Sequence, residues 1–201
     1  MRVLAATLMV LYASYSPALV RAESEIPDLS RDQTPTGAKL DYFSRVDEGV
    51  YKGSEPKSDS DYRFLQSLHV KYIVDLRPLS WLHRSDERKA KRYGIEIIRV
   101  GFNASPISPS RKHIETALAI LGDVRCQPVY FHCAFGRDRT ALIAALYKMY
   151  FLGMSPEAAK QYLHEAGYKD GWVRHGLAGY LEKHPTPSPS FRSPDRRHCG
   201  S

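Results

Sequence analysis

The stretch VYFHCAFGRDRTALIAALYKMY, residues 129–150, limits the possible folds of this 201-residue chain more than any other segment. It joins a short apolar run, a turn that contains Gly136, and a longer run that is apolar on almost every side. The short run suits a buried strand and the long run a buried helix. We therefore predict a strand over 128–132, a tight turn, and a helix over 141–153.

Strand and helix patterns alternate along the rest of the chain. Strands are predicted at 50–54, 71–77 and 95–100, and helices at 58–70, 81–94, 108–122, 155–164 and 172–181. This alternation predicts an α/β fold with a central, mostly parallel sheet flanked by helices on both faces. Ligands bind such sheets at the carboxyl ends of the strands, where the turn around Gly136 falls.

Both ends of the chain are predicted to lie outside the domain. Residues 1–22 have a basic start, an apolar run and small residues near a cleavage point, which is the layout of a secretory signal peptide. We expect cleavage, export to the periplasm or medium, and no stable membrane insertion; an uncleaved N-terminal anchor is the alternative. Residues 23–39 are predicted as a linker, 40–183 as one domain, and 184–201 as a flexible Pro/Ser/Arg-rich tail.

The net charge of +7, or +5 once Arg2 and Arg21 leave with the signal peptide, suits an anionic partner. A nucleic-acid-binding protein would show a basic stripe with interleaved aromatic residues, and this sequence does not. We expect phosphorylated substrates, no nucleic acid, and a monomer.

The chain has three cysteines, Cys126, Cys133 and Cys199. Along a strand, Cys126 and Cys133 would lie about 20 Å apart, whereas a disulfide needs Cα atoms within about 7 Å. Those two cannot pair, and Cys199 could reach either one only through a loose tail. The redox state of Cys126 and Cys199 is therefore open, and a free Cys133 outside the cytosol needs a compensating use.

The turn after the predicted strand can form an anion site. Its backbone amides, those of Ala134, Phe135, Gly136, Arg137, Asp138 and Arg139, can curl inward, and the helix dipole adds positive potential. A cysteine at the base of this turn would have a lowered pKa, and the Arg139 guanidinium can hold two phosphate oxygens at once. His132 can orient the loop, and the Thr140 hydroxyl can donate to the Cys133 sulfur. The alternative is that Cys133 only fills space in the core.

The segment HCAFGRDRT resembles the His-Cys-x5-Arg-Ser/Thr signature of the protein tyrosine phosphatase superfamily. VYKGSEP (50–56) and IVDLRP (73–78) are similar to segments of its compact atypical dual-specificity branch in bacteria, plants and fungi. The resemblance implies a phosphate loop between a strand and a buried helix. It also implies that Cys133 attacks phosphorus to form a phosphocysteine, that Arg139 and the loop amides bind the equatorial oxygens, and that no metal or cofactor takes part.

The general acid departs from the family pattern. Most members keep an aspartate in a separate loop, but the corresponding segment, GFNASPISPS (101–110), has no Asp or Glu. Asp138 is the best candidate, because the CxxGxDRT form resembles phosphatases in which a loop aspartate is proposed as the acid. The alternative is that Asp138 pairs with Arg137 and structures the loop. Asp75 is expected to pair with Arg77, and Glu55 to border the pocket.

These residues predict a metal-free phosphatase acting on phosphotyrosine or phosphoserine protein, with a phosphoinositide or inositol phosphate as the alternative substrate. The variable loop positions Phe135 and Arg137 are expected to influence this choice, and the charge of Arg137 favours a multiply phosphorylated or lipid substrate. Two other classes stay open: a catalytically silent phosphate-binding module, and a sulfurtransferase of rhodanese type.

Overall fold

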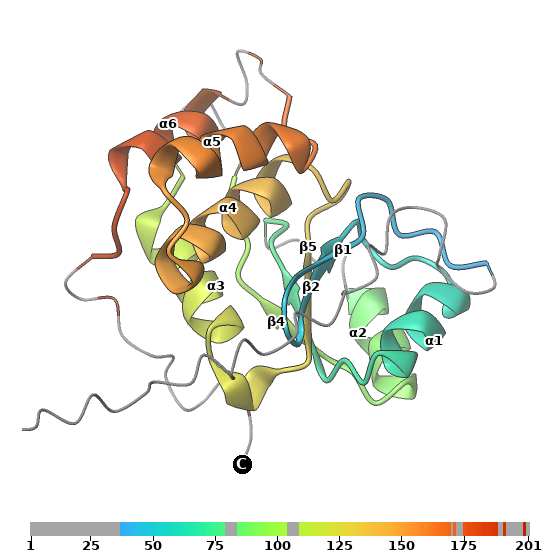
Figure 1. Ribbon diagram of the computed structural model, residues 1–201. Coiled ribbons are helices and arrows are strands. Elements are labelled where there is room, and N and C mark those ends of the chain that lie inside the picture. The colour runs from blue at the N-terminus through green and yellow to red at the C-terminus, as the bar shows by residue number, and fades with distance from the viewer. Residues whose placement is uncertain are drawn as a thin grey trace, which may run out of the picture.

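A five-stranded sheet forms the centre of the computed structural model (Figure 1). The structure describes residues 37–78, 84–103, 109–169, 171, 175–188, 191 and 199. The side chains of Arg84 and His175 are not described. The strands are β1 (Ser44–Asp47), β2 (Val50–Gly53), β3 (Tyr72–Asp75), β4 (Glu96–Arg99) and β5 (Val129–His132). Their order is β1-β2-β5-β3-β4, with β1 antiparallel to β2 and the other pairs parallel. The predicted mostly parallel sheet is confirmed, whereas the edge strand β1 was not predicted.

Helices cover both faces of the sheet. They are α1 (Asp59–Ser67), α2 (Arg84–Arg92), α3 (Arg111–Leu121), the 3-10 turn η2 (Val124–Cys126), α4 (Asp138–Leu152), α5 (Pro156–Glu165) and α6 (His175–Lys183). Figure 1 shows α1 and α2 together on one side of the sheet and α3, α4, α5 and α6 on the other. The α/β prediction is therefore confirmed.

The central strand β5 connects two hydrophobic cores. Phe131 belongs to the core under α3, α4, α5 and α6, whereas Tyr130 points into the core under α1 and α2. All four residues of β5 are buried. Because successive side chains of a strand point to opposite faces, the continuous apolar run is what a strand covered on both sides requires.

Two helix starts differ from the sequence prediction. α4 begins at Asp138 rather than at residue 141, because polar residues that serve the preceding loop already have helical backbone. α3 begins at Arg111, after an extended Ser110, rather than at residue 108. Apolar periodicity detects neither start, because the first turn of each helix carries polar side chains.

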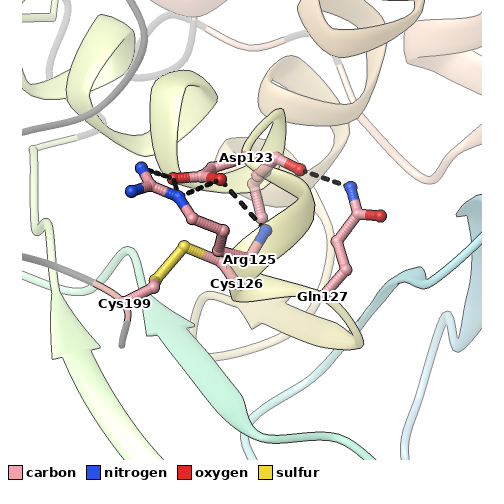
Figure 2. The surroundings of a disulfide bond; sticks show 6 residues. Asp123, Arg125, Cys126, Gln127 and Cys199 are labelled. Carbon is pink, nitrogen blue, oxygen red and sulfur yellow. Dashed lines mark hydrogen bonds and ion pairs between the residues drawn. A yellow bond between two sulfur atoms is a disulfide. The ribbon is translucent and has the colours of Figure 1, made fainter. Parts of the chain in front are cut away.

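Described residues of the predicted flexible tail contact the domain. The backbone N–H and hydroxyl of Ser188 donate to the Glu115 carboxylate at 3.0 and 2.8 Å, and Phe191 packs against Tyr150. Cys199 forms a disulfide with Cys126 in η2 (Figure 2). The predicted leader at 1–22 lies outside the described residues. Within the described chain, no helix is both long and apolar enough to cross a membrane.

Candidate active site

The segment between β5 and α4 forms a tight loop at the carboxyl end of the central strand. Gly136, in the middle of this loop, has φ of +68°, a left-handed conformation that favours glycine. A Cβ atom at this position would lie 2.6 Å from the Gly53 carbonyl carbon and the Ser54 nitrogen. The loop therefore folds closely onto the end of β2, and both the conformation and the space at this position require glycine.

Cys133 lies at the base of the loop. Its side chain is buried, with 3% of the residue exposed, and it is a free cysteine. The Cys133 N–H donates to the hydroxyl oxygen of Thr140 at 2.9 Å. Thr140 thus joins the two ends of the loop through its oxygen, and donation of its hydroxyl hydrogen to the Cys133 sulfur stays a prediction.

His132 is the last residue of β5 and lies beneath the loop. Its Nδ1 is 3.0 Å from the carbonyl oxygen of Cys133, so the neutral ring can donate to that oxygen. Burial lowers the pKa of His132, and this effect outweighs the opposing charge of Asp75. The imidazole is therefore neutral near pH 7, in the state suited to orienting the loop rather than to carrying charge.

The Arg139 side chain, on the first turn of α4, reaches across the carboxyl ends of the strands. Its Nη1 atom donates to the carbonyl oxygens of Leu76 and Phe102 at 3.2 and 3.4 Å. These carbonyls lie just beyond β3 and β4, which bring them to the same edge of the sheet as the loop. The guanidinium is consequently fixed at this edge, the position expected for an arginine that holds phosphate.

Phe135, Arg137 and Asp138 form the outer part of the loop. Phe135 is 64% exposed, and the Arg137 guanidinium carbon lies 5.6 Å from its ring centroid. Asp138 is buried at the start of α4, with its Oδ2 atom 3.7 Å from Nη2 of Arg137. This geometry accommodates both roles considered for Asp138, the proton donor and the partner of Arg137.

A group of buried and partly buried charges lies beside the loop. Arg77 donates to both carboxylate oxygens of Asp75 at 2.9 and 2.8 Å, and it also pairs with Glu55 at 2.5 Å and Asp86 at 2.7 Å. The predicted pair of Asp75 and Arg77 is confirmed. Glu55 borders the loop, because its N–H donates to the carbonyl of Ala134 at 3.5 Å. The carboxylates of Asp75 and Glu55 are held by Arg77 and are poorly placed to act as acids.

Lys52 is a charged residue near the loop that the sequence reasoning did not identify. It is 3% exposed, and its ammonium donates to the Tyr42 carbonyl at 3.1 Å. Burial lowers the pKa of Lys52 to about 8, whereas the charge of Cys133 raises it. The sequence does carry one sign that Lys52 is buried: residues alternate along a strand, which puts Lys52 on the same face as the apolar Val50.

The segment that lacks an acid connects β4 to α3. Residues 104–108 of this segment lie outside the described residues, and the rest carries Gly101, Phe102, Asn103, Pro109 and Ser110. Phe102 is buried in the core, and its carbonyl contacts Arg139. The described part of this segment therefore holds the arginine and supplies no carboxylate.

A mostly parallel sheet with Cys-x5-Arg between its central strand and a helix defines the cysteine-dependent phosphatases as a class. The profile of the tyrosine phosphatase family matches residues 39–150, and the chain belongs to this family. The resemblance inferred from the signature is thereby confirmed, and compact dual-specificity phosphatases are among the relatives.

Three comparisons illustrate the relationship. Inositol diphosphatase DSP3 of Arabidopsis thaliana is 30% identical over 143 residues, which are 67% of this chain and 66% of that protein. Dual specificity protein phosphatase TpbA of Pseudomonas aeruginosa is 24% identical over 130 residues, 63% of this chain and 55% of that protein. The catalytic core of the PP-IP phosphatase SIW14 from S. cerevisiae shares the fold, with a TM-score of 0.65 at 21% identity, over 73% of this chain and 87% of that one. The chain spans about half to two thirds of the length of the inositol diphosphatases it matches.

Proposed function

We propose that this chain hydrolyses phosphate monoesters through a phosphocysteine at Cys133. The observation that carries the proposal is the loop itself: a buried free cysteine at its base, bonded to Thr140, with Arg139 fixed six residues further on. The backbone amides of the loop and the Arg139 guanidinium would stabilise the charge on the transferring phosphoryl group.

The reaction has two steps that use the same loop. The Cys133 thiolate forms a bond to phosphorus while the bond to the leaving oxygen breaks, and an acid, for which Asp138 is the candidate, protonates that oxygen. Water then attacks phosphorus, the P–S bond breaks, and inorganic phosphate leaves with the thiolate restored. The carboxylate that gave its proton in the first step can take one from this water in the second.

The proposal is tested by hydrolysis of an aryl phosphate by the wild type, Cys133→Ser and Arg139→Met. We expect no measurable turnover by Cys133→Ser and a loss of about 10²–10³-fold in kcat for Arg139→Met, the usual effect of removing one transition-state donor. Tungstate binding by Cys133→Ser controls for folding. If the wild type is as inactive as Cys133→Ser and both bind tungstate, the chain is a phosphate-binding module. Persulfide formation from thiosulfate at Cys133 would instead identify a sulfurtransferase.

Phosphotyrosine or phosphoserine protein is the substrate class we propose first, and inositol phosphates are the second candidate. Arg137 and the exposed Phe135 at the outer part of the loop support the second candidate, since a guanidinium there can bind an additional phosphate. The inositol diphosphatase relatives support it as well.

Arg137→Met separates the two substrate classes. If inositol polyphosphates are the substrates, we expect this variant to raise their KM about tenfold, the effect of losing one charge-assisted hydrogen bond, and to change the KM for an aryl phosphate much less. Arg125→Met, a change at an exposed arginine in η2, is the matched control. A preference of the wild type for phosphopeptides, unchanged in Arg137→Met, would favour the protein substrate.

Export is a further part of the proposal, and it is supported by the composition of residues 1–22. N-terminal sequencing of the protein from its native host tests it. A mature chain that begins at Glu23 is expected, whereas an intact leader in the membrane fraction would indicate an anchor.

A further inference from the structure

Lys52 lies in the sheet directly beside the strand that leads to the loop. β2 runs parallel to β5, with Lys52 opposite Phe131 and Gly53 opposite His132. Cys133 directly follows β5, and it belongs with Phe131 to the core on one side of the sheet. Val50 and Phe131 both belong to the core under α4, which puts Lys52 on that side too. Lys52 therefore lies diagonally across from Cys133, the first residue after β5, on the same side of the sheet.

The surroundings of Lys52 hold its ammonium in place. Its Nζ donates to the carbonyl of Tyr42. Tyr42 has φ of +55°, which is uncommon for a residue other than glycine. The next residue, Gly53, is in close contact with Gly136 of the loop. With 3% of Lys52 exposed, its side chain lies inside the fold.

Burying an ammonium is costly unless an opposite charge is close. Burial lowers the pKa of Lys52 to about 8, and the negative charge of Cys133 is the influence that raises it. Because this value is above 7, the side chain is still mainly protonated at neutral pH. The thiolate would therefore have a fixed cation beside it on the β2 side.

We propose that Lys52 is a positioning residue that favours the thiolate form of Cys133 from the β2 side of the loop. The proposal rests on the proposed use of Cys133 as the nucleophile. The ammonium makes no contact with substrate; it acts through the sulfur, by favouring the charged form of the thiol. Other titratable or charged groups on the elements that carry Cys133 are Tyr130 and His132 of β5, and Arg137, Asp138 and Arg139 of the loop and the start of α4.

The test is the pH dependence of Cys133 alkylation by iodoacetamide, which reports the thiolate fraction without any turnover. The variants are Lys52→Met, which removes the charge, and Lys52→Arg, which keeps it. Lys148→Met is the matched control, since Lys148 also donates to a main-chain carbonyl, that of Val46 in β1, at 3.3 Å.

We expect the midpoint of Cys133 alkylation in Lys52→Met to rise by on the order of one pH unit, so that alkylation below the midpoint slows about tenfold. Lys52→Arg should retain most of the wild-type profile and Lys148→Met all of it. An unchanged midpoint in Lys52→Met would overturn the proposal, whether or not the chain is a phosphatase.

A reciprocal measurement leaves Lys52 intact and applies even if Lys52→Met does not fold. If the thiolate stabilises the ammonium, removing the thiolate must lower the pKa of Lys52 by the same coupling. We expect the Lys52 ammonium, followed by NMR of isotope-labelled lysine, to titrate at lower pH in Cys133→Ser than in the wild type. Identical titrations in the two proteins would contradict the proposal.

Discussion

Two residues of the loop must be in different protonation states for the reaction to proceed at one pH. Cys133 has to be an anion to attack, whereas the acid has to hold a proton until the leaving oxygen needs it. Asp138 is buried at the start of α4, with Arg137 beside it. Asp138 is the carboxyl group within the loop itself, which makes it the candidate for this acid.

Asp138→Asn separates a proton donor from a residue that only structures the loop. An alkoxide is a poor leaving group without a proton, whereas a nitrophenolate leaves readily. We expect kcat for an alkyl phosphate to fall about 10²–10⁴-fold, the usual contribution of general acid catalysis, and kcat for p-nitrophenyl phosphate to fall far less. Steady-state kinetics on both substrates decides the matter, and equal losses would assign Asp138 a structural role with Arg137.

At the scale of the elements, the end of β3 is held by a buried group of charges. Asp75 accepts from Arg77, and also from Arg99 of β4 at 2.7 Å, so that one carboxylate joins two neighbouring strands. Burial alone raises the pKa of Asp75, but the hydrogen bonds from Arg77 and the charges nearby outweigh burial and lower it below its ordinary value of 3.8. The unfolded chain therefore takes up this proton at higher pH than the folded chain does.

The stability contributed by Asp75 should be complete above about pH 4 and disappear as the pH falls through its lower folded pKa. We expect Asp75→Asn to reduce the free energy of unfolding at pH 7 by about 3 kcal/mol, because Arg77 and Arg99 lose their shared buried carboxylate and keep more exposed partners such as Glu55 and Glu87. It should also flatten the loss of stability below pH 4. Denaturant unfolding between pH 7 and pH 2 measures both effects. Asp59→Asn, in the exposed pair with Arg92, is the control and should change stability by less than about 1 kcal/mol; equal effects of the two variants would contradict this account.

The parts of the fold that the sequence predicted are those set by local pattern. The helices α1 and α5, the buried strand β5 and the apolar helix α4 each have a signal within a few neighbouring residues. The strand β1 has no such signal, because its SRVD sequence does not alternate between apolar and polar residues. It forms a strand through its pairing with β2. Burial of Lys52 depends on how β2 aligns with β5, and that register is determined by the tertiary structure rather than by neighbours along the chain.

At the scale of the whole molecule, a disulfide links Cys199 to the turn that precedes β5, at the end of this strand that is far from the loop. Cys126 in η2 and Cys199 are 73 residues apart in sequence, with Cα atoms 5.2 Å apart. Figure 2 shows the bond beside Asp123, which accepts from the Arg125 N–H, and Gln127, which donates to the Leu121 carbonyl. No spacing rule connects Cys199 to Cys126, so the sequence alone left this pairing open.

The disulfide and the catalytic thiol place opposite demands on the redox state of the solution. A cross-link that closes a loop of this length can stabilise the fold by about 4 kcal/mol, whereas Cys133 is proposed to work only when it is reduced. We expect dithiothreitol to lower the Tm of the wild type while preserving or increasing phosphatase activity well below that Tm. The double variant Cys126→Ala, Cys199→Ala should have the lower Tm from the start and show no further change with reductant. Since Cys126 and Cys133 lie at opposite ends of β5, a parallel loss of activity and Tm on reduction would mean instead that the disulfide supports the loop through the strand between them.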